Sequence, residues 1–207
     1  MRASGRHSMD LRFCYDSFAE RQICRAEALG MSDIAQTAGL LIALQRHDAR
    51  AFGFMVERRY RRLDPVVRAL TRLGDAPVVV LGVAGLLSSS DAELHASGVL
   101  ALVAVASSHL LVQLLKRTIS RPRPRLPIGV AALIQPPDRF SFPSGHAAAA
   151  LSLALAIAPA AGVLGVAILA VGFAVGISRC YLGVHYPGDV LAGWLVATAG
   201  FLLGVAL

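Results

Sequence analysis

Residues 146–178 form an apolar run that a single membrane helix cannot accommodate. The run contains no Asp, Glu, Lys or Arg, and a helix needs only about 20 residues to cross a hydrocarbon core of roughly 30 Å. Pro159 and Gly162 interrupt the run in "APAAG", and they predict a tight turn between two antiparallel helices.

Three further apolar stretches, at residues 76–90, 98–115 and 189–207, accompany this pair of helices. Hydrophobic residues make up 56% of the chain, which is too apolar for an ordinary soluble domain. We therefore predict an all-α fold, a polytopic membrane bundle of about five to six transmembrane helices, with its core domain at residues 74–207. The expected location is a cell membrane crossed several times, and we expect the bacterial inner membrane.

Residues 31–73 are less apolar than the core that follows them. Residues 34–44 are only about two-thirds of a span, and residues 52–63, "FGFMVERRYRRL", are amphipathic and basic. We expect interfacial helices here, with residues 34–44 as the alternative sixth span. Residues 1–30 carry charge throughout, and we expect either a disordered arm or a true start at Met31.

The net charge is +7, and the basic residues fall mainly in residues 46–72 and 116–125. A nucleic-acid-binding protein could have this charge, but it would not carry several apolar spans. The expected partners are therefore the lipid bilayer and a phosphorylated lipid, with no nucleic acid, while the oligomeric state stays open. Cys14, Cys24 and Cys180 have no metal-type spacing, so neither a disulfide framework nor a zinc site is predicted.

Polar residues are concentrated in three short segments, each at the end of a predicted helix. The first polar segment, "KRTISRPRP", begins at Lys116 and contains Arg123 followed by Pro124. The second is "PSGH", residues 143–146, and the third is "SRCYLGVHYPGD", which begins at Ser178. Successive helices cross the bilayer in opposite directions, so all three segments fall on one side and should meet there.

The second and third polar segments have the chemistry of an anion site. Ser144 and Gly145 resemble an N-cap that leaves free backbone N–H groups, and such a helix start binds anions. His146 follows, where an imidazole can give or take a proton beside the anion. Asp189 can reach back to one ring nitrogen of His185, which leaves the other nitrogen free as a nucleophile or base.

The remaining arginines near these segments have a simpler interpretation. For Arg117, Arg121 and Arg125 we predict anchoring at the lipid headgroups, following the positive-inside rule. Arg179 ends a helix, where it could be a C-terminal counter-charge or could point at the same site.

One polar stripe lies inside an otherwise apolar span. His109, Gln113 and Lys116 share a helical face through i+4 and i+3 steps. Such a stripe should face the bundle interior, so His109 and Gln113 are candidates for the wall of a substrate pocket.

Together, the three polar segments resemble the signature of the type 2 phosphatidic acid phosphatase family, which shares a fold with vanadium haloperoxidases. That signature is Lys, six residues and Arg-Pro; then Pro-Ser-Gly-His; then Ser-Arg, five residues, His, three residues and Asp. The chain carries every position of it, and the resemblance covers residues 74–207.

The resemblance implies a role for each signature residue. His185 would attack phosphorus and form a phosphohistidine, Asp189 would orient it, and His146 would protonate the leaving oxygen. Five groups would hold the non-bridging oxygens: Lys116, Arg123, Ser144, the Gly145 N–H and Arg179. The scheme needs no metal and no cofactor.

The leading hypothesis is therefore a membrane lipid phosphate phosphatase. Its substrate would be phosphatidic acid, phosphatidylglycerophosphate, a polyprenyl diphosphate or a lipid A phosphate. A lipid phosphotransferase could use the same site, with an acceptor other than water. From a different class, the polar cluster could belong to a transporter or to a protein that binds anionic lipid without turnover.

Overall fold

The computed structural model describes residues 32–207, so the arm predicted at residues 1–30 lies outside the described residues. The chain divides into two units, Met1–His47 and Asp48–Leu207. The second unit contains all three polar segments. It begins earlier than the core predicted at residues 74–207, because side chains between residues 48 and 71 form hydrogen bonds with the core.

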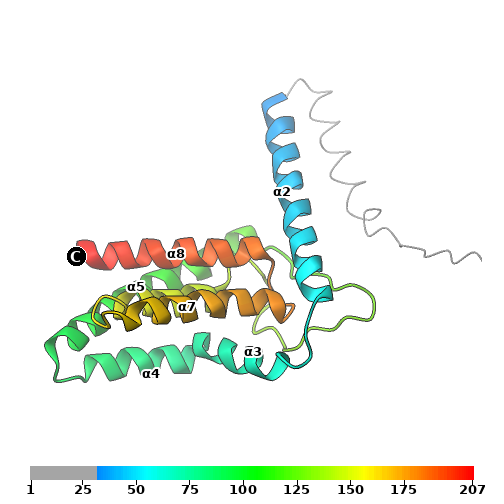
Figure 1. Ribbon diagram of the computed structural model, residues 1–207. Coiled ribbons are helices and arrows are strands. Elements are labelled where there is room, and N and C mark those ends of the chain that lie inside the picture. The colour runs from blue at the N-terminus through cyan, green and yellow to red at the C-terminus, as the bar shows by residue number, and fades with distance from the viewer. Residues whose placement is uncertain (1–31) are drawn as a thin grey trace, which may run out of the picture. The chain divides into compact units, whose positions relative to one another are not determined.

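The described residues form an all-helical fold, as predicted (Figure 1). The elements are α2 (Ser32–Glu57), α3 (Asp64–Thr71), the 3-10 turn η1 (Arg72–Gly74), α4 (Ala76–Leu87), α5 (Ala92–Ile119), α6 (Gly145–Ile157), α7 (Leu164–Tyr181) and α8 (Pro187–Ala206). Residues 32–207 contain no β-strand beyond an isolated bridge between Pro122 and Phe140. The turn predicted at Pro159 and Gly162 is confirmed, since it separates α6 from α7.

Three helices are long and apolar enough to cross a membrane: α5 with 28 residues, α7 with 18 and α8 with 20. The segment Asp64–Gly74 and α4 together also pass as one span, although they are bent by 54°. α6 has only 13 residues, and 13 residues extend about 20 Å at 1.5 Å per residue, against a hydrocarbon core of roughly 30 Å. The predicted count of five to six spans is therefore not confirmed, and the described residues supply three or four by length and composition.

Residues 34–44, the alternative sixth span, are part of α2, which continues to Glu57. α2 is not among the helices apolar enough to cross a membrane. Its sequence explains this, because Arg46, Asp48 and Arg50 follow the apolar stretch within the same helix.

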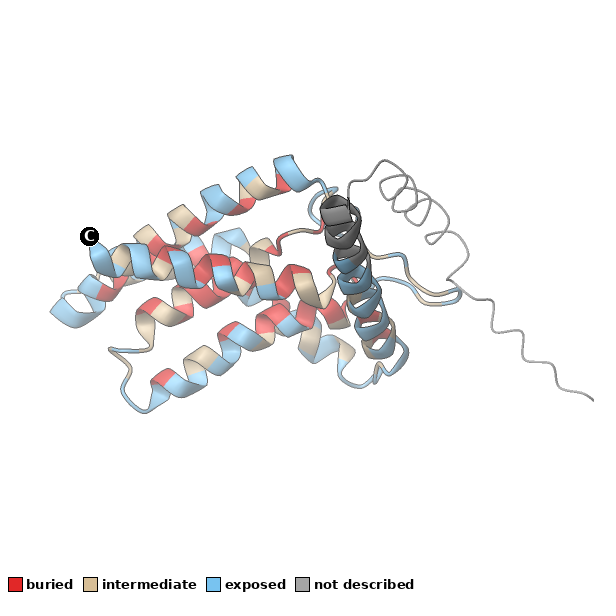
Figure 2. Ribbon diagram, turned by 90° about the horizontal axis from the view of Figure 1, so that it is seen from above, coloured by how far each residue is buried: buried red, intermediate tan, exposed pale blue. Residues whose placement is uncertain are grey.

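The centre of the bundle is α6, which contacts α4, α5, α7 and α8. Most of its buried residues are alanines, and small side chains allow helices to approach closely. Figure 2 shows the buried residues on the inward faces of the bundle. Gly193 of α8 lies against the start of α6, since a Cβ there would lie 2.6 Å from the Ser144 carbonyl oxygen. This close approach holds the second polar segment against the start of α8.

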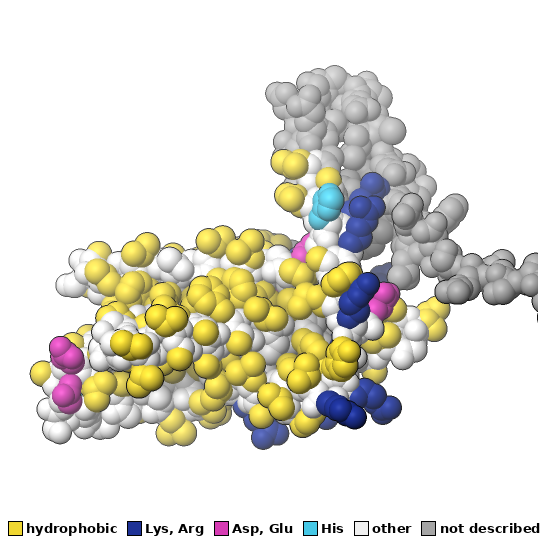
Figure 3. Space-filling model, in the orientation of Figure 1, with side chains coloured by type: hydrophobic (Ala, Val, Ile, Leu, Met, Phe, Trp, Pro, Cys, Tyr) yellow, Lys and Arg dark blue, Asp and Glu magenta, His cyan; other side chains and the backbone are white. Residues whose placement is uncertain are grey.

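The outward faces of the spanning helices are apolar. Leu110 of α5, Val166 of α7 and Leu195 of α8 are each more than 60% exposed. Figure 3 shows hydrophobic side chains over most of the viewed face of the bundle, with Lys and Arg side chains gathered toward the end that carries α3. This distribution is typical of a membrane protein whose charged end lies at the headgroups.

Candidate active site

The three polar segments meet at one end of the bundle, as the sequence predicts. Arg123 of the first segment lies 3.2 Å from His185 of the third, measured from Nη1 to Nε2. The same Nη1 donates a hydrogen bond of 2.7 Å to the Val184 carbonyl. The second segment is tied to the third, because the Ser144 N–H donates 2.9 Å to the Asp189 carbonyl.

The surroundings of His185 define its tautomer. A guanidinium has no acceptor, so the Nε2 atom that faces Arg123 must carry the lone pair. The ring proton is therefore on Nδ1, which lies 3.7 Å from Asp189 Oδ2. This separation is too long for a hydrogen bond. Since His185 is 1% exposed and Asp189 is fully buried, the pair is shielded from solvent.

The local sequence explains how His185 reaches this position. α7 ends at Tyr181, and Gly183 adopts φ of +85°, a left-handed turn that suits glycine. A Cβ at Gly183 would also lie 2.5 Å from an Arg59 guanidinium nitrogen. Pro187 then begins α8, and Asp189 Oδ2 accepts a hydrogen bond of 2.9 Å from the Tyr186 N–H. Turn and cap together orient the His185–Asp189 pair.

Arg121 is a half-buried structural link rather than the headgroup anchor that the sequence suggested. Its guanidinium donates a hydrogen bond of 2.6 Å to Asp189 Oδ1 and another of 2.7 Å to Asp48 Oδ2. The guanidinium carbon also lies 4.2 Å from the ring centroid of Tyr186. Asp48 also accepts 2.7 Å from the Gly188 N–H. Burial alone would lower the pKa of Arg121, but Asp189 and Asp48 outweigh it and raise the pKa.

Asp138 is a site residue that the sequence analysis missed. Its carboxylate lies between two predicted phosphate-binding cations, 2.5 Å from Lys116 Nζ and 2.8 Å from Arg123 Nη2. Burial would raise the pKa of Asp138, but the hydrogen bonds and charges of both cations hold it below its usual value. The two carboxylate oxygens of Asp138 thus contact Lys116 and Arg123 in the way that two phosphate oxygens could contact them.

The second polar segment begins α6 as predicted. Ser144 is the N-cap, and its hydroxyl oxygen accepts the Ala147 N–H at 3.5 Å. His146 lies in the first turn, where its Nε2 is 2.8 Å from Asp75 Oδ1. Asp75 stands just before α4, and it is a third carboxylate, after Asp48 and Asp138, that the sequence did not predict. Each histidine of the site therefore has an aspartate beside it.

Arg179 is buried with unused donors. It is 1% exposed, and its Nη1 donates 2.8 Å to the Thr71 hydroxyl. Its Nε and Nη2 have no hydrogen-bond partner among the described residues. A cavity of about 260 Å³ adjoins it, lined by Arg68, Thr71, Arg72, Asp75, Ile134, Gln135, Pro137, His146 and Arg179. Arg179 and His146 thus share one open space.

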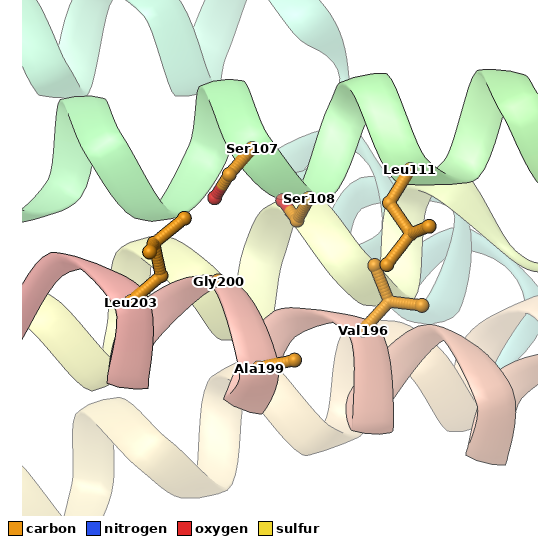
Figure 4. Close-up of a pocket in the computed structure, with 7 residues that line it drawn as sticks. All are labelled: Ser107, Ser108, Leu111, Val196, Ala199, Gly200 and Leu203. Carbon is orange, nitrogen blue, oxygen red and sulfur yellow. The ribbon is translucent and has the colours of Figure 1, made fainter.

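The predicted polar stripe on α5 does not line this cavity. His109 is exposed and Gln113 is half-buried, while Lys116 is buried at the site. A second cavity, of about 230 Å³, lies between α5 and α8 (Figure 4). Its walls are mostly apolar, and the hydroxyl of Ser107 already donates to the Val103 carbonyl at 2.7 Å. This second cavity contains none of the predicted site residues.

Removal of the Asp138 carboxylate should strengthen the binding of small anions. In Asp138→Asn, Lys116 and Arg123 lose their internal counter-charge, so we expect inorganic phosphate to inhibit at roughly tenfold lower concentration. The measurement is the competitive inhibition constant of inorganic phosphate against turnover of a lipid phosphate substrate in detergent micelles. Asp91→Asn is the matched control, because Asp91 caps the far end of α5. An unchanged or weaker inhibition by phosphate in Asp138→Asn would contradict this role.

His185 should remain neutral well below neutral pH. Burial lowers the pKa of His185 to about 4, and the charges of Arg123 and Arg179 act in the same direction against the opposing effect of Asp189. A lowered histidine pKa means that the imidazole is deprotonated at pH 7 and gains its proton only as the pH approaches 4. ¹⁵N NMR of histidine-labelled protein, assigned with His185→Asn, should show the neutral Nδ1–H form down to about pH 5. A midpoint near 6.5 would contradict the burial argument.

Fold and site together define a helical membrane protein with a histidine–aspartate pair among clustered cations at one end of its bundle. The sequence profile of the PAP2 superfamily matches residues 97–207. The chain belongs to this superfamily, which confirms the resemblance seen in the three polar segments.

Curated relatives are similar to parts of the chain. Decaprenylphosphoryl-5-phosphoribose phosphatase of Mycolicibacterium smegmatis is 40% identical over 86 residues, which cover 42% of this chain and 46% of the relative. The match thus spans about half the length of that relative. Phosphatidylglycerophosphatase B of Bacillus subtilis is 32% identical over 163 residues, covering 68% of this chain and 73% of the relative.

A solved structure extends the similarity to the fold. The crystal structure of Aquifex aeolicus LpxE aligns with a TM-score of 0.67 at 25% identity, and the alignment covers 76% of this chain and 94% of that chain. The helical arrangement of the chain is therefore shared with that protein.

Proposed function

We propose that the protein hydrolyses the phosphate ester or diphosphate of a membrane lipid through a phosphohistidine at His185. One observation carries the proposal: the lone pair of His185 Nε2 faces Arg123 at 3.2 Å, inside a cluster that also holds Lys116 and Arg179. A neutral imidazole beside fixed cations has what attack on an anionic phosphorus requires. The cations hold the equatorial oxygens and stabilise the charge that develops on them.

In the first step, His185 Nε2 forms a bond to phosphorus while the bond from phosphorus to the leaving oxygen breaks. His146, held by Asp75, gives a proton to that oxygen. Burial and the charges of Arg179 and Lys116 lower the pKa of His146 to about 4 against the opposing effect of Asp75, so the imidazolium forms only beside the bound phosphate, whose negative charge favours it. The positive charge that the phosphohistidine ring gains through its Nδ1–H faces the Asp189 carboxylate. Lys116, Arg123, Arg179, Ser144 and the Gly145 N–H would hold the remaining oxygens, and Asp138 would give up its place on the cations.

In the second step, water attacks phosphorus on the face opposite His185. His146, now neutral, accepts the proton of the water, and the bond from phosphorus to His185 breaks. Inorganic phosphate leaves and both histidines return to their first state. Splitting a slow hydrolysis into two displacements is the advantage of a covalent intermediate.

The substrate is an amphiphile whose phosphate lies at headgroup depth. The site lies at one end of the bundle, and α5, α7 and α8 present apolar side chains along their lengths. A lipid tail beside these helices brings its phosphate to the site while the tail remains in the bilayer. The names of the relatives, which act on a decaprenylphosphoryl sugar phosphate and on phosphatidylglycerophosphate, support this class of substrate.

The test is phosphate release by the purified protein in detergent micelles. The expected result is turnover of at least one substrate among phosphatidic acid, phosphatidylglycerophosphate and a polyprenyl diphosphate, at a rate that millimolar EDTA leaves unchanged. Failure to hydrolyse all three would reject the proposal, and loss of turnover in EDTA would reject its metal-independent mechanism. A phosphorylated acceptor lipid in place of free phosphate would instead identify a phosphotransferase.

A further inference from the structure

The cavity beside His146 extends beyond the residues that the proposed reaction uses. Two of its wall residues, Arg68 of α3 and Arg72 of η1, lie outside the three polar segments. Both are exposed, and neither forms an ion pair or a side-chain hydrogen bond with another residue of the described chain. Their guanidinium groups are therefore available to a ligand in the cavity.

A third arginine, Arg179, lies on the same wall, and the proposed reaction already assigns it to an oxygen of the reacting phosphate. Arg179 is 1% exposed, and its Nε and Nη2 have no partner among the described residues. Buried donors are nearly always paired, and an unpaired buried charge is costly. The only carboxylate on the wall is Asp75, which already accepts from His146. The walls therefore hold three arginines against one carboxylate, and that carboxylate is engaged.

The position of His146 indicates on which side of the reacting phosphate the cavity lies. His146 lies on the cavity wall, whereas His185, Lys116 and Arg123 do not. Under the proposed mechanism His146 protonates the leaving oxygen, so the cavity lies on the side of the leaving group. Its volume of about 260 Å³ is many times the roughly 30 Å³ that one water molecule occupies in the liquid. The space is sufficient for a further charged group of the substrate.

We infer that this cavity is a second anion subsite that binds a phosphate carried by the leaving group itself. Arg68 and Arg72 would hold that phosphate, since one guanidinium group can donate two parallel hydrogen bonds to two phosphate oxygens. Thr71 and Gln135 add a hydroxyl and an amide to the same wall. The inference rests on the proposed function, and it narrows the substrate class. A lipid diphosphate, or a lipid whose headgroup bears two separate phosphates, fills both sites, whereas phosphatidic acid leaves as an uncharged diacylglycerol and fills one.

The test compares two substrates that share a tail and differ by one phosphate, farnesyl diphosphate and farnesyl phosphate. For the wild type we expect a higher kcat/KM with the diphosphate. In Arg68→Ala/Arg72→Ala the ratio of the two kcat/KM values should fall by about tenfold or more, because the second phosphate of the diphosphate loses its charge-assisted hydrogen bonds while farnesyl phosphate has no such phosphate to lose. Arg68→Lys/Arg72→Lys keeps the charge and should fall in between.

Arg61→Ala/Arg62→Ala is the matched control. It removes two exposed arginines from the same basic segment, and neither of them lines the cavity. The substrate ratio of this variant should equal that of the wild type. An equal ratio for Arg68→Ala/Arg72→Ala and the wild type, or an equal fall in both double variants, would overturn the subsite and indicate general attraction to headgroups. Hydrolysis of neither farnesyl substrate by the wild type would instead count against the proposed function.

Discussion

His185→Asn is expected to abolish phosphate release while leaving the fold intact. Asparagine keeps a polar side chain of similar reach, but it offers no nitrogen lone pair for phosphorus. Loss of a catalytic nucleophile costs on the order of 10⁴- to 10⁶-fold in rate, so turnover should fall to the assay background. The measurement is phosphate release in micelles, together with a thermal unfolding midpoint that stays near the wild-type value.

His95→Asn supplies the control for this result. His95 lies near the start of α5, and its Nδ1 is 2.8 Å from the Leu87 carbonyl oxygen, so it belongs to the end of α5 opposite Lys116. This variant should keep wild-type turnover. A folded His185→Asn protein with more than about a hundredth of the wild-type rate would exclude a covalent role for His185.

Arg121→Ala is expected to have the second-largest effect, on both turnover and stability. The substitution leaves the fully buried Asp189 without its cation, and it also removes the ion pair between Arg121 and Asp48. Breaking a buried pair by removing one partner costs about 3–5 kcal/mol. We expect a clear fall in the unfolding midpoint and a loss of about a hundredfold or more in kcat, because the carboxylate that orients His185 is no longer fixed.

If Arg121 only positions Asp189, its removal should change kcat and KM by different amounts. Since Arg121 faces Asp189 and Asp48 rather than the cavity, KM should change much less than kcat. Arg121→Lys retains the charge and should recover part of the rate. Arg117→Ala, on the exposed side of the same helix end, is the matched control and should behave as wild type. A large rise in KM with an unchanged kcat would instead place Arg121 on the substrate.

The sequence predicted the meeting of the three polar segments because that outcome depends only on helix order and spacing. Each segment ends or begins a helix, so alternation of direction brings His146, His185 and Arg123 to one end of the bundle. The residue spacing also predicted Ser144 as an N-cap and Asp189 beside His185. These features are local, and short-range geometry is what a single sequence specifies best.

The missed residues are those whose partners lie far away in the sequence. Asp48 is 73 residues from Arg121, and Asp75 is 71 residues from His146. Asp138 lies in a loop whose course depends on tertiary contacts such as the bond from Ser141 N–H to the Arg121 carbonyl. Hydropathy carries no signal for such pairings. The scarcity of carboxylates in an apolar chain, with only 13 Asp and Glu residues in all, was the one available indication.

The predicted spans differ in length from the observed helices for a different reason. Apolar residues continue through turns, so the apolar run at 76–90 extends beyond the end of α4 at Leu87. In the same way, the run that begins at His146 continues past Ile157, where α6 ends two residues before Pro159. Hydropathy therefore counted turn residues as part of a span, so the predicted apolar runs are longer than the described helices.

The carboxylates that support the two histidines have a practical consequence for protein engineering. The superfamily profile begins at residue 97, yet Asp48 and Asp75 precede it and contact Arg121 and His146. A chimera that exchanged only the profile region between relatives would combine the two histidines of one parent with the supporting carboxylates of another. A segment that keeps Arg121 and His146 together with these carboxylates must therefore begin no later than Asp48.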